Sequence, residues 1–189
     1  MALSVAFDGL PGSGKTTVIG MIADDLKNRG FKVEIADIET VGHARIIRPI
    51  TKTFPLGHPA RILLFWVLRL EQYERMLKAE ADIVLLDRFW GSTLAYDLYG
   101  NKIPPEAIEW LRQYLSRQPD ITLFFDAPLS VVRQRKEAKT MSDLVFARRV
   151  EEGYKKLARK LSWTRVDATE KPEEVKRHCL EVILPRLID

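Results

Sequence analysis

The stretch Gly9-Leu10-Pro11-Gly12-Ser13-Gly14-Lys15-Thr16 decides how the rest of the chain is interpreted. It follows the apolar run Leu3 to Phe7 and precedes a segment whose apolar residues recur at helical spacing. Five of its eight positions are Gly, Pro or Ser, so backbone N–H groups can approach an anion without obstruction by a large side chain. The stretch therefore predicts a phosphate-binding loop between a strand and a helix.

Within this loop, Lys15 is expected to meet the outer phosphates of a nucleoside triphosphate, and Thr16 to hold Mg²⁺ through its hydroxyl. The positive end of the following helix strengthens the field at the same place. The alternative is an ordinary glycine-rich turn between a strand and a helix. The predicted ATP-binding residues of this stretch are Gly9, Pro11, Gly12, Ser13, Gly14, Lys15, Thr16 and Thr17.

Length and composition favour a single soluble domain over residues 1–189. Hydrophobic residues make up 46% of the chain and charged residues 30%, which is far from a disordered composition. The net charge of +4 comes without a block of basic residues, so no nucleic-acid polymer is expected as a partner. The longest apolar run, Ile62 to Leu68, is too short to cross a membrane. We therefore expect a cytoplasmic protein with no membrane partner.

Five apolar runs alternate with helical segments, which predicts an α/β fold. Its core is a three-layer, doubly wound sheet of five parallel strands with helices on both faces, because parallel strands need long crossovers and cover on each side. Ligands bind at the carboxyl ends of such strands, where several of these runs carry an acidic residue. The predicted strands are Leu3 to Asp8, Val33 to Asp37, Ile83 to Leu86, Ile121 to Phe125 and Trp163 to Val166.

The predicted helix Ala60 to Ala79 carries an unusual second face. Ile62, Trp66, Leu70, Tyr73 and Leu77 form the stripe expected in the core, whereas Phe65, Arg69 and Gln72 share another face by their i, i+4, i+7 spacing. One interpretation is a solvated face with a partly exposed Phe. The other is a base-recognition face, with the ring stacked on a planar ligand and Arg69 and Gln72 donating to its polar edge.

Asp87-Arg88 follows the third strand and is expected to lie beside the phosphate-binding loop across the sheet. In the functional interpretation, Asp87 orients Mg²⁺ water or takes up the acceptor proton, and Arg88 spans phosphate groups through its planar fork. The alternative is a helix-capping Asp with a surface Arg.

A charge-rich segment between two predicted helices is a candidate lid, spanning about residues 136–148. In a phosphoryl-transfer enzyme it would close cations over the transferred group and exclude water, with Lys136 and Lys139 as catalytic candidates. The alternative is a solvated loop. The basic residues in and around this segment are Arg133, Arg135, Lys136, Lys139, Arg148 and Arg149.

These residues resemble the thymidylate kinases, a family of nucleoside monophosphate kinases with a P-loop fold. The resemblance covers nearly the whole chain; its most specific parts are the stretches Phe7 to Thr17 and Asp87-Arg88-Phe89 through Tyr96. It implies phosphate transfer from ATP to dTMP with Mg²⁺, and often a homodimer. By position, Phe65 would stack on thymine, Arg69 would read its edge and Arg88 would touch the phosphates. Tyr96 and Gln72 would also lie on the acceptor side, and Arg135 near the donor adenine.

Two departures from the family pattern concern the acceptor. Pro11 stands where relatives carry an Asp that holds the acceptor sugar. The stretch Ile38-Glu39-Thr40-Val41-Gly42 stands where they place an Arg that clamps the acceptor phosphate, which leaves Arg45 and Arg48 as candidate substitutes.

The residues thus favour an ATP-dependent kinase of a pyrimidine deoxynucleoside monophosphate, with dTMP to dTDP as the leading reaction. A second hypothesis keeps this chemistry but takes a nucleoside or another small hydroxyl compound as acceptor. A third is a non-catalytic nucleotide-binding regulator of the GTP-switch type. That class needs Asn-Lys-x-Asp, and Asn101-Lys102-Ile103-Pro104 lacks the Asp.

Overall fold

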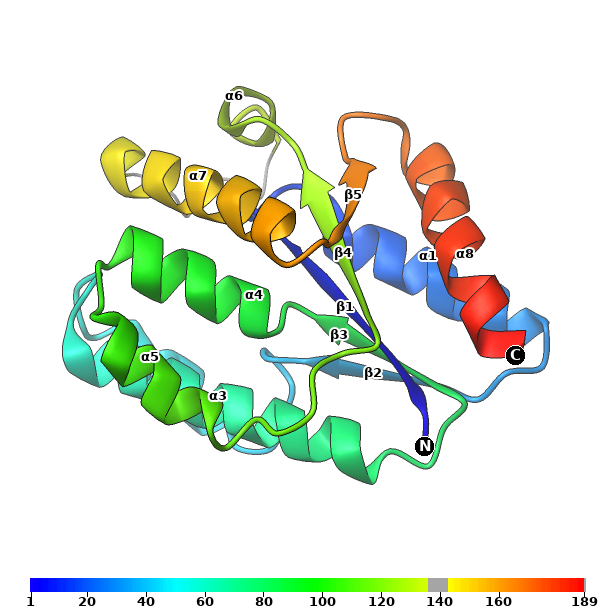
Figure 1. Ribbon diagram of the computed structural model, residues 1–189, viewed down its shortest axis with the longest axis horizontal. Helices are drawn as coiled ribbons and strands as arrows, with labels where there is room; N and C mark the ends of the chain where they lie inside the picture. Colours follow the sequence, from blue (N-terminus) through cyan, green and yellow to red (C-terminus); the bar gives the residue numbers. More distant parts are fainter. Residues whose placement is uncertain (136–142, 189) are drawn as a thin grey trace.

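Five parallel strands form the centre of the computed structural model, which describes residues 1–135 and 143–188 (Figure 1). Their order in the sheet is β2-β3-β1-β4-β5. Helices lie on both faces, so the α/β, P-loop kinase type of architecture that the sequence predicts is confirmed. The strands are β1 (Leu3–Gly9), β2 (Val33–Asp37), β3 (Ile83–Asp87), β4 (Ile121–Asp126) and β5 (Thr164–Asp167).

Strand β1 lies in the middle of the sheet, and most of its side chains are apolar on both faces. Val5, Ala6 and Phe7 are at most 1% exposed, as expected for a strand covered by helices above and below. In the register, Phe7 pairs with Asp87 of β3 and with Leu123 of β4. The chain that leaves β1 therefore enters the phosphate-binding loop beside the carboxyl ends of both neighbouring strands.

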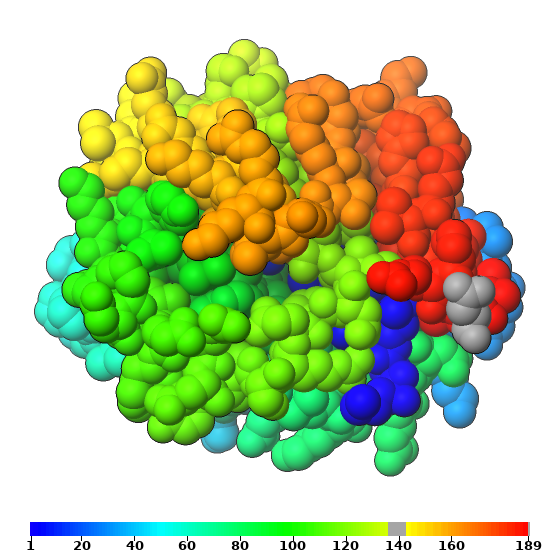
Figure 2. Space-filling model, in the orientation of Figure 1, coloured from blue at the N-terminus to red at the C-terminus, as the bar shows by residue number. Residues whose placement is uncertain are grey.

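The helices divide between the two faces of the sheet (Figure 1). Helices α1 (Lys15–Asn28) and α8 (Pro172–Ile188) lie side by side on one face. Helix α3 (Pro59–Lys78) packs on the other face against β2 and β3. In the space-filling view these layers leave β1 visible mainly near the N-terminus (Figure 2). The remaining helices are α2 (Ala44–Thr51), α4 (Trp90–Thr93), α5 (Pro105–Arg112), α6 (Leu129–Val132) and α7 (Leu144–Lys160).

The segment after β3 holds an element for which the sequence analysis made no prediction. Helix α4 continues directly into a seven-residue π-helix, η1 (Leu94–Gly100), which packs closely against α7. A Cβ on Gly100 would lie 2.7 Å from the Phe146 ring, and one on Gly153 would lie 2.8 Å from Tyr99. Both glycines therefore allow the two helices to approach closely.

The lid segment falls partly outside the described residues. Residues 136–142, which include Lys136 and Lys139, are not described. Residues 144–148 of the same predicted segment form the first turns of α7, whose N-cap Asp143 accepts a hydrogen bond from the Phe146 N–H.

The single cysteine lies in the core, and the helices do not resemble membrane spans. Cys179 on α8 is fully buried, and burial raises the pKa of its thiol to about 12. Within the described part of the chain, every helix is too short or too polar to cross a bilayer.

Candidate active site

The phosphate-binding loop adopts conformations that only glycine takes easily. Gly9, Gly12 and Gly14 have φ values of 150°, 78° and 86°, all in the region that disfavours a Cβ. A Cβ on Gly9 would also lie 2.6 Å from the backbone oxygen of Phe125. The loop thus turns sharply between β1 and α1, and it brings the N-terminus of α1 to the carboxyl edge of the sheet.

Lys15, the first residue of α1, lies inside this turn. Its side chain is 4% exposed, and Nζ donates to Leu10 O at 2.7 Å and to Ser13 Oγ at 2.9 Å. Phosphate oxygens would form stronger hydrogen bonds to this ammonium than the Leu10 carbonyl and the Ser13 hydroxyl do, because an anionic acceptor forms the stronger hydrogen bond. The loop therefore positions Lys15 for an anion.

Thr16 and Asp87 meet across the sheet. Thr16 Oγ1 donates to Asp87 Oδ2 at 2.5 Å, so the structure places the carboxylate at the end of β3 beside the loop. Asp37 lies opposite Asp87 in the sheet register; burial, and to a smaller extent the Asp87 charge, raises the pKa of Asp37.

This oxygen pair fits a magnesium ion that also uses substrate phosphates. Mg²⁺ prefers hard oxygen ligands, and it is usually bound by one or two protein groups together with phosphates and water. No cluster of three or more His, Cys, Asp or Glu side chains within residues 1–135 and 143–188 could hold a metal without such help. Thr16 and Asp87 are therefore the candidate protein-side groups for Mg²⁺.

Arg88 is fixed next to the loop by an unusual backbone and a buried network. Its φ is 64°, a left-handed conformation that costs energy in a residue other than glycine. Nη1 donates to Gly9 O at 2.8 Å and lies 3.4 Å from Tyr154 Oη. The guanidinium thus lies against the phosphate-binding loop, and not on an open surface.

Asp8, which the sequence analysis noted only as a strand end, anchors this network. Its Oδ1 accepts from Ser92 Oγ at 2.6 Å and from the Phe89 N–H at 3.3 Å. Ser92 Oγ in turn lies 2.7 Å from Tyr154 Oη. Asp8 is completely buried, and its Oδ2 has no hydrogen-bond partner among the described residues. The sequence did contain a signal for this role: a carboxylate lies within a mostly apolar strand, and burying a carboxylate is costly unless polar groups compensate for it.

The prediction for the faces of the long helix is wrong in one respect. Arg69 is 3% exposed and Gln72 is fully buried, whereas Leu77, assigned to the core stripe, is 45% exposed. The inversion has a polar cause: Arg69 Nη1 donates to Arg88 O at 2.9 Å, and Gln72 Nε2 donates to Ala36 O at 2.6 Å and to Arg88 O at 2.8 Å. These bonds offset the cost of burying Arg69 and Gln72. They also hold the carbonyl of Arg88, whose backbone is in the strained left-handed conformation.

Burial leaves Arg69 charged at neutral pH. Its loss of solvent lowers its pKa to about 10, with a smaller opposing effect of the Asp8 charge. Nε also donates to Thr93 Oγ1 at 3.2 Å. Arg69 therefore links α3 to α4 as a cation while it contributes to a cleft wall. The proposed donation of Gln72 to a bound base stays a prediction, since its amide here serves the backbone.

One cleft of about 550 Å³ joins the loop to the predicted acceptor residues. Phe65, Arg69, Arg88 and Tyr96 line it together with Lys15. Six of its lining side chains are cationic and three are acidic, which favours an anionic ligand. The lining residues are Pro11, Gly12, Gly14, Lys15, Thr16, Ile38, Glu39, Arg48, Thr51, Lys52, Leu56, Gly57, Arg61, Ile62, Phe65, Arg69, Arg88, Ser92, Thr93, Tyr96, Asp97, Asn101, Asp143 and Phe146.

Asp97 brings a perturbed carboxyl group to the same cleft. Burial raises its pKa to about 6, although hydrogen bonds from Trp66 Nε1 at 2.7 Å and Asn101 Nδ2 at 3.1 Å act in the opposite direction. Asn101, the first residue of the incomplete guanine motif, thus serves as a partner of Asp97.

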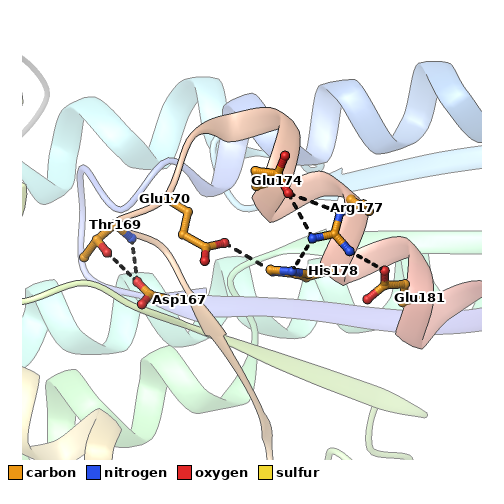
Figure 3. Close-up of polar contacts among 7 residues, drawn as sticks. All are labelled: Asp167, Thr169, Glu170, Glu174, Arg177, His178 and Glu181. Atoms are coloured by element: carbon orange, nitrogen blue, oxygen red, sulfur yellow. Dashed lines mark hydrogen bonds and ion pairs between the residues drawn. The ribbon is translucent and has the colours of Figure 1, made fainter.

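Arg135 connects the loop to the far edge of the sheet. Nη1 donates to Gly12 O at 3.2 Å, and Nη2 donates to Ala168 O at 2.9 Å. The turn that presents Ala168 is held by Asp167, whose Oδ1 accepts from the Thr169 N–H and hydroxyl (Figure 3). The predicted place of Arg135 beside a donor adenine stays a prediction; its side chain joins the two loops that would flank the donor.

Figure 3 also shows the ion pairs along the first turns of α8, which follow that turn in the chain. Arg177 bridges Glu174 and Glu181, and His178 Nδ1 lies 3.2 Å from Glu170. These pairs are partly exposed, so each contributes little to stability.

Among the basic residues near the predicted lid that the structure describes, Arg149 has an unusual environment. Its Nε is buried and has no hydrogen-bond partner in the described part of the chain, whereas Arg133 and Arg148 are exposed.

Comparison with known proteins supports the resemblance found in the sequence. The family model described as thymidylate kinase matches residues 7–179. A thymidylate kinase of Geotalea daltonii is 29% identical over 180 residues, covering 84% of each chain. One of Synechococcus sp. is 28% identical over 200 residues, covering 95% of this chain and 94% of the relative. One of Acinetobacter baumannii is 26% identical over 196 residues, covering 95% and 98%.

Proposed function

Because this chain belongs to the thymidylate kinase family and is thus a phosphotransferase, we propose that it transfers the γ-phosphoryl group of ATP to dTMP, giving ADP and dTDP. One observation carries this proposal: the phosphate-binding loop and the Phe65, Arg69 and Tyr96 side chains line the same cleft. A donor bound on the loop and a planar acceptor on Phe65 would therefore face each other in one enclosed space.

On the donor side, the chain provides the cations and backbone groups that phosphoryl transfer needs. Lys15 would leave Leu10 O and Ser13 Oγ for the outer phosphates. Arg88 lies beside the same loop, where its guanidinium would stabilise the charge that spreads over the transferred group. Thr16 and Asp87 would hold Mg²⁺, which neutralises phosphate charge when bound.

The acceptor chemistry needs no general base. A phosphate monoester loses its second proton with a pKa of about 6, so a dTMP phosphate oxygen is already a nucleophile at neutral pH. It forms a bond to the γ-phosphorus while the bond from that phosphorus to the β-phosphate oxygen breaks, and ADP leaves. Of the two roles considered for Asp87, the metal-side role is therefore the proposed one.

On the acceptor side, Phe65 would stack on the pyrimidine, and Arg69 and Tyr96, which line the same cleft, would lie at the edge of the base. Pro11 also lines the cleft, but proline carries no side-chain acceptor for a sugar hydroxyl. The sugar is therefore expected to depend on other groups or to be held less tightly.

A nucleoside acceptor remains the second candidate, and Glu39 favours it. Its carboxylate lines the cleft near the end of β2, where an anionic acceptor phosphate would be repelled unless a cation compensates. A nucleoside hydroxyl would also need a base, and Asp87 is available to serve as one.

Steady-state ADP release with ATP and Mg²⁺ tests the choice, using dTMP, dUMP, dCMP and thymidine as acceptors and mass spectrometry of the product. We expect the highest kcat/KM for dTMP, with dTDP as product. A higher value for thymidine would make the protein a nucleoside kinase, and no stimulation by any pyrimidine would reject both candidates.

A further inference from the structure

A bidentate ion pair lies across the predicted base-stacking residue. Arg48 on α2 donates from Nε to Glu39 Oε2 at 2.6 Å, and its Nη2 lies 2.5 Å from Glu39 Oε1. The guanidinium carbon of Arg48 also stands 5.0 Å from the centre of the Phe65 ring. All three side chains line the cleft. A planar cation held by a carboxylate therefore occupies one face of Phe65.

The 5.0 Å between the Arg48 guanidinium carbon and the Phe65 ring centre leaves no room for a base between them. Stacked aromatic groups keep their centroids about 4.5–7 Å apart, so the position of Arg48 over the ring is one that a stacked pyrimidine would take. A ligand that stacks on this face must therefore displace Arg48 and break its pair with Glu39.

Neighbouring cations would repel a displaced Arg48 unless it found an anionic partner. Arg61, another cleft cation, is close enough that the Arg48 charge contributes to lowering its pKa, after the larger effect of its own burial. Lys52 is a third cation that lines the same cleft. An arginine released among other cations gains most from a new anionic partner, and the planar fork that grips a carboxylate also fits a phosphate.

We propose that the Arg48–Glu39 pair is a latch on the acceptor face of Phe65, and that Arg48 exchanges the Glu39 carboxylate for the phosphate of the acceptor when the base binds. The inference rests on the proposed function, because it takes a nucleoside monophosphate as the acceptor. It assigns the missing acceptor-phosphate cation to Arg48 and gives Glu39 the role of holding that cation before the acceptor arrives. Arg48 thereby discriminates between acceptors with and without a phosphate.

The latch predicts opposite effects of one substitution on two ligands. In Arg48→Met, dTMP loses its phosphate partner, and we expect its Kd to rise about 10- to 100-fold, as for a hydrogen-bonded charge. Thymidine has no phosphate to compensate for displacing Arg48, so the same variant should bind thymidine as tightly as the wild type or more tightly. Glu39→Gln weakens the latch and should tighten the binding of both ligands.

Isothermal titration with dTMP and thymidine measures these constants on the full-length protein, and thermal unfolding verifies that each variant is folded. Arg45→Met is the matched control, because Arg45 is exposed on the same helix and is not among the described residues that line the cleft; its Kd values should equal those of the wild type.

Three results would overturn the inference. Equal weakening of dTMP and thymidine in Arg48→Met would make Arg48 a base or packing contact. Equal effects of Arg45→Met and Arg48→Met on dTMP would indicate general electrostatics. A dTMP Kd unchanged in Arg48→Met would assign the phosphate to another cation. Each of these leaves the proposed function intact, whereas failure of the wild type to bind or phosphorylate dTMP would reject the proposed function itself, and the latch with it.

Discussion

Single residues in this protein hold energetically unfavourable positions next to the cleft. Arg88 takes a left-handed backbone conformation, and its carbonyl accepts from both Arg69 and Gln72. Asp8 is a carboxylate inside the central strand. Such positions persist only where the surroundings fix them, and they are common at functional sites.

Lys15→Met tests the loop at this scale. Methionine keeps most of the apolar stem but removes the charge that would stabilise the transferred phosphate, so we expect kcat to fall about 10²- to 10³-fold. The thermal midpoint should change little. Lys27→Met, an exposed lysine on the same helix, is the control and should retain full activity; comparable turnover of the two variants would refute the role of Lys15.

Asp97 gives the fold a pH dependence with a definite sign. Its pKa in the folded protein, about 6, lies above the ordinary value of 3.8 for an aspartic acid. The neutral form therefore favours the folded state, and this stabilisation is lost as pH rises through about 6. Asn mimics the neutral acid and can still accept from Trp66. The stability advantage of Asp97→Asn over wild type should therefore be about 1 kcal/mol larger at pH 8 than at pH 5.

Urea unfolding at the two pH values measures this difference. An equal effect of Asp97→Asn at pH 5 and pH 8 would mean that the carboxyl group does not titrate in this range.

Among the elements, the π-helix is the one with the clearest relation to the cleft. Four side chains from α4 and η1, namely Ser92, Thr93, Tyr96 and Asp97, line it together with Asn101. Wider winding changes which residues share a face, and π-helical segments are frequent at functional sites. η1 thus places Tyr96 and its neighbour Asp97 on the same wall.

The sequence predicted the strands well and the helix faces less well, for physical reasons. A strand buried on both faces, such as β1, needs only an apolar run and is easy to detect. The burial of Arg69 and Gln72 depends on carbonyls of β2 and of Arg88 that are remote in sequence, so periodicity assigned them to a solvated or ligand face. η1 does not follow the helical period of 3.6, and its segment received no prediction.

The site was predictable to the extent that its residues are local. Lys15, Thr16 and Asp87 follow directly from the loop and the adjoining strand end, and the structure brings Thr16 and Asp87 into contact. Arg48 could be named only as one of two alternatives to a missing arginine, because the position of α2 relative to Phe65 is a tertiary property.

Two glycines, one at the end of β1 and one within α1, allow the cost of an unusual backbone conformation to be measured separately from helix propensity. Gly9→Ala puts a Cβ 2.6 Å from a β4 backbone oxygen at a φ of 150°, and we expect a loss of about 3 kcal/mol or more in unfolding free energy. Gly20→Ala adds a methyl group in the middle of α1 with nothing within 4 Å. It should stabilise the protein by about 0.5–1 kcal/mol. Urea unfolding of the two variants and the wild type measures both changes. A loss of stability in Gly20→Ala as well would mean that its added methyl group is crowded, contrary to the geometry.

For the whole molecule, Arg135 joins two distant parts of the chain at the carboxyl edge of the sheet. Arg135→Met removes both bonds, so the loop and the Asp167 turn lose their common partner. We expect the KM for ATP to rise about three- to tenfold, while the KM for dTMP stays near its wild-type value. Initial rates at varied concentrations of ATP and dTMP test this. Arg133→Met is the control, because Arg133 is exposed. Equal increases in both constants would assign Arg135 a general structural role.

The order of strands in the sheet has a consequence for biosynthesis. β1 leaves the ribosome before both of its neighbours in the sheet: Leu3 pairs with Ile83 and Val5 with Ile121, which are translated much later. Until β4 is synthesised, the nascent chain carries an apolar strand with an unpaired edge, a feature that promotes aggregation and attracts chaperones. The strand that leads into the phosphate-binding loop is thus made before the strands that hold it in the sheet, and a truncated chain that ends before β4 should bind no nucleotide.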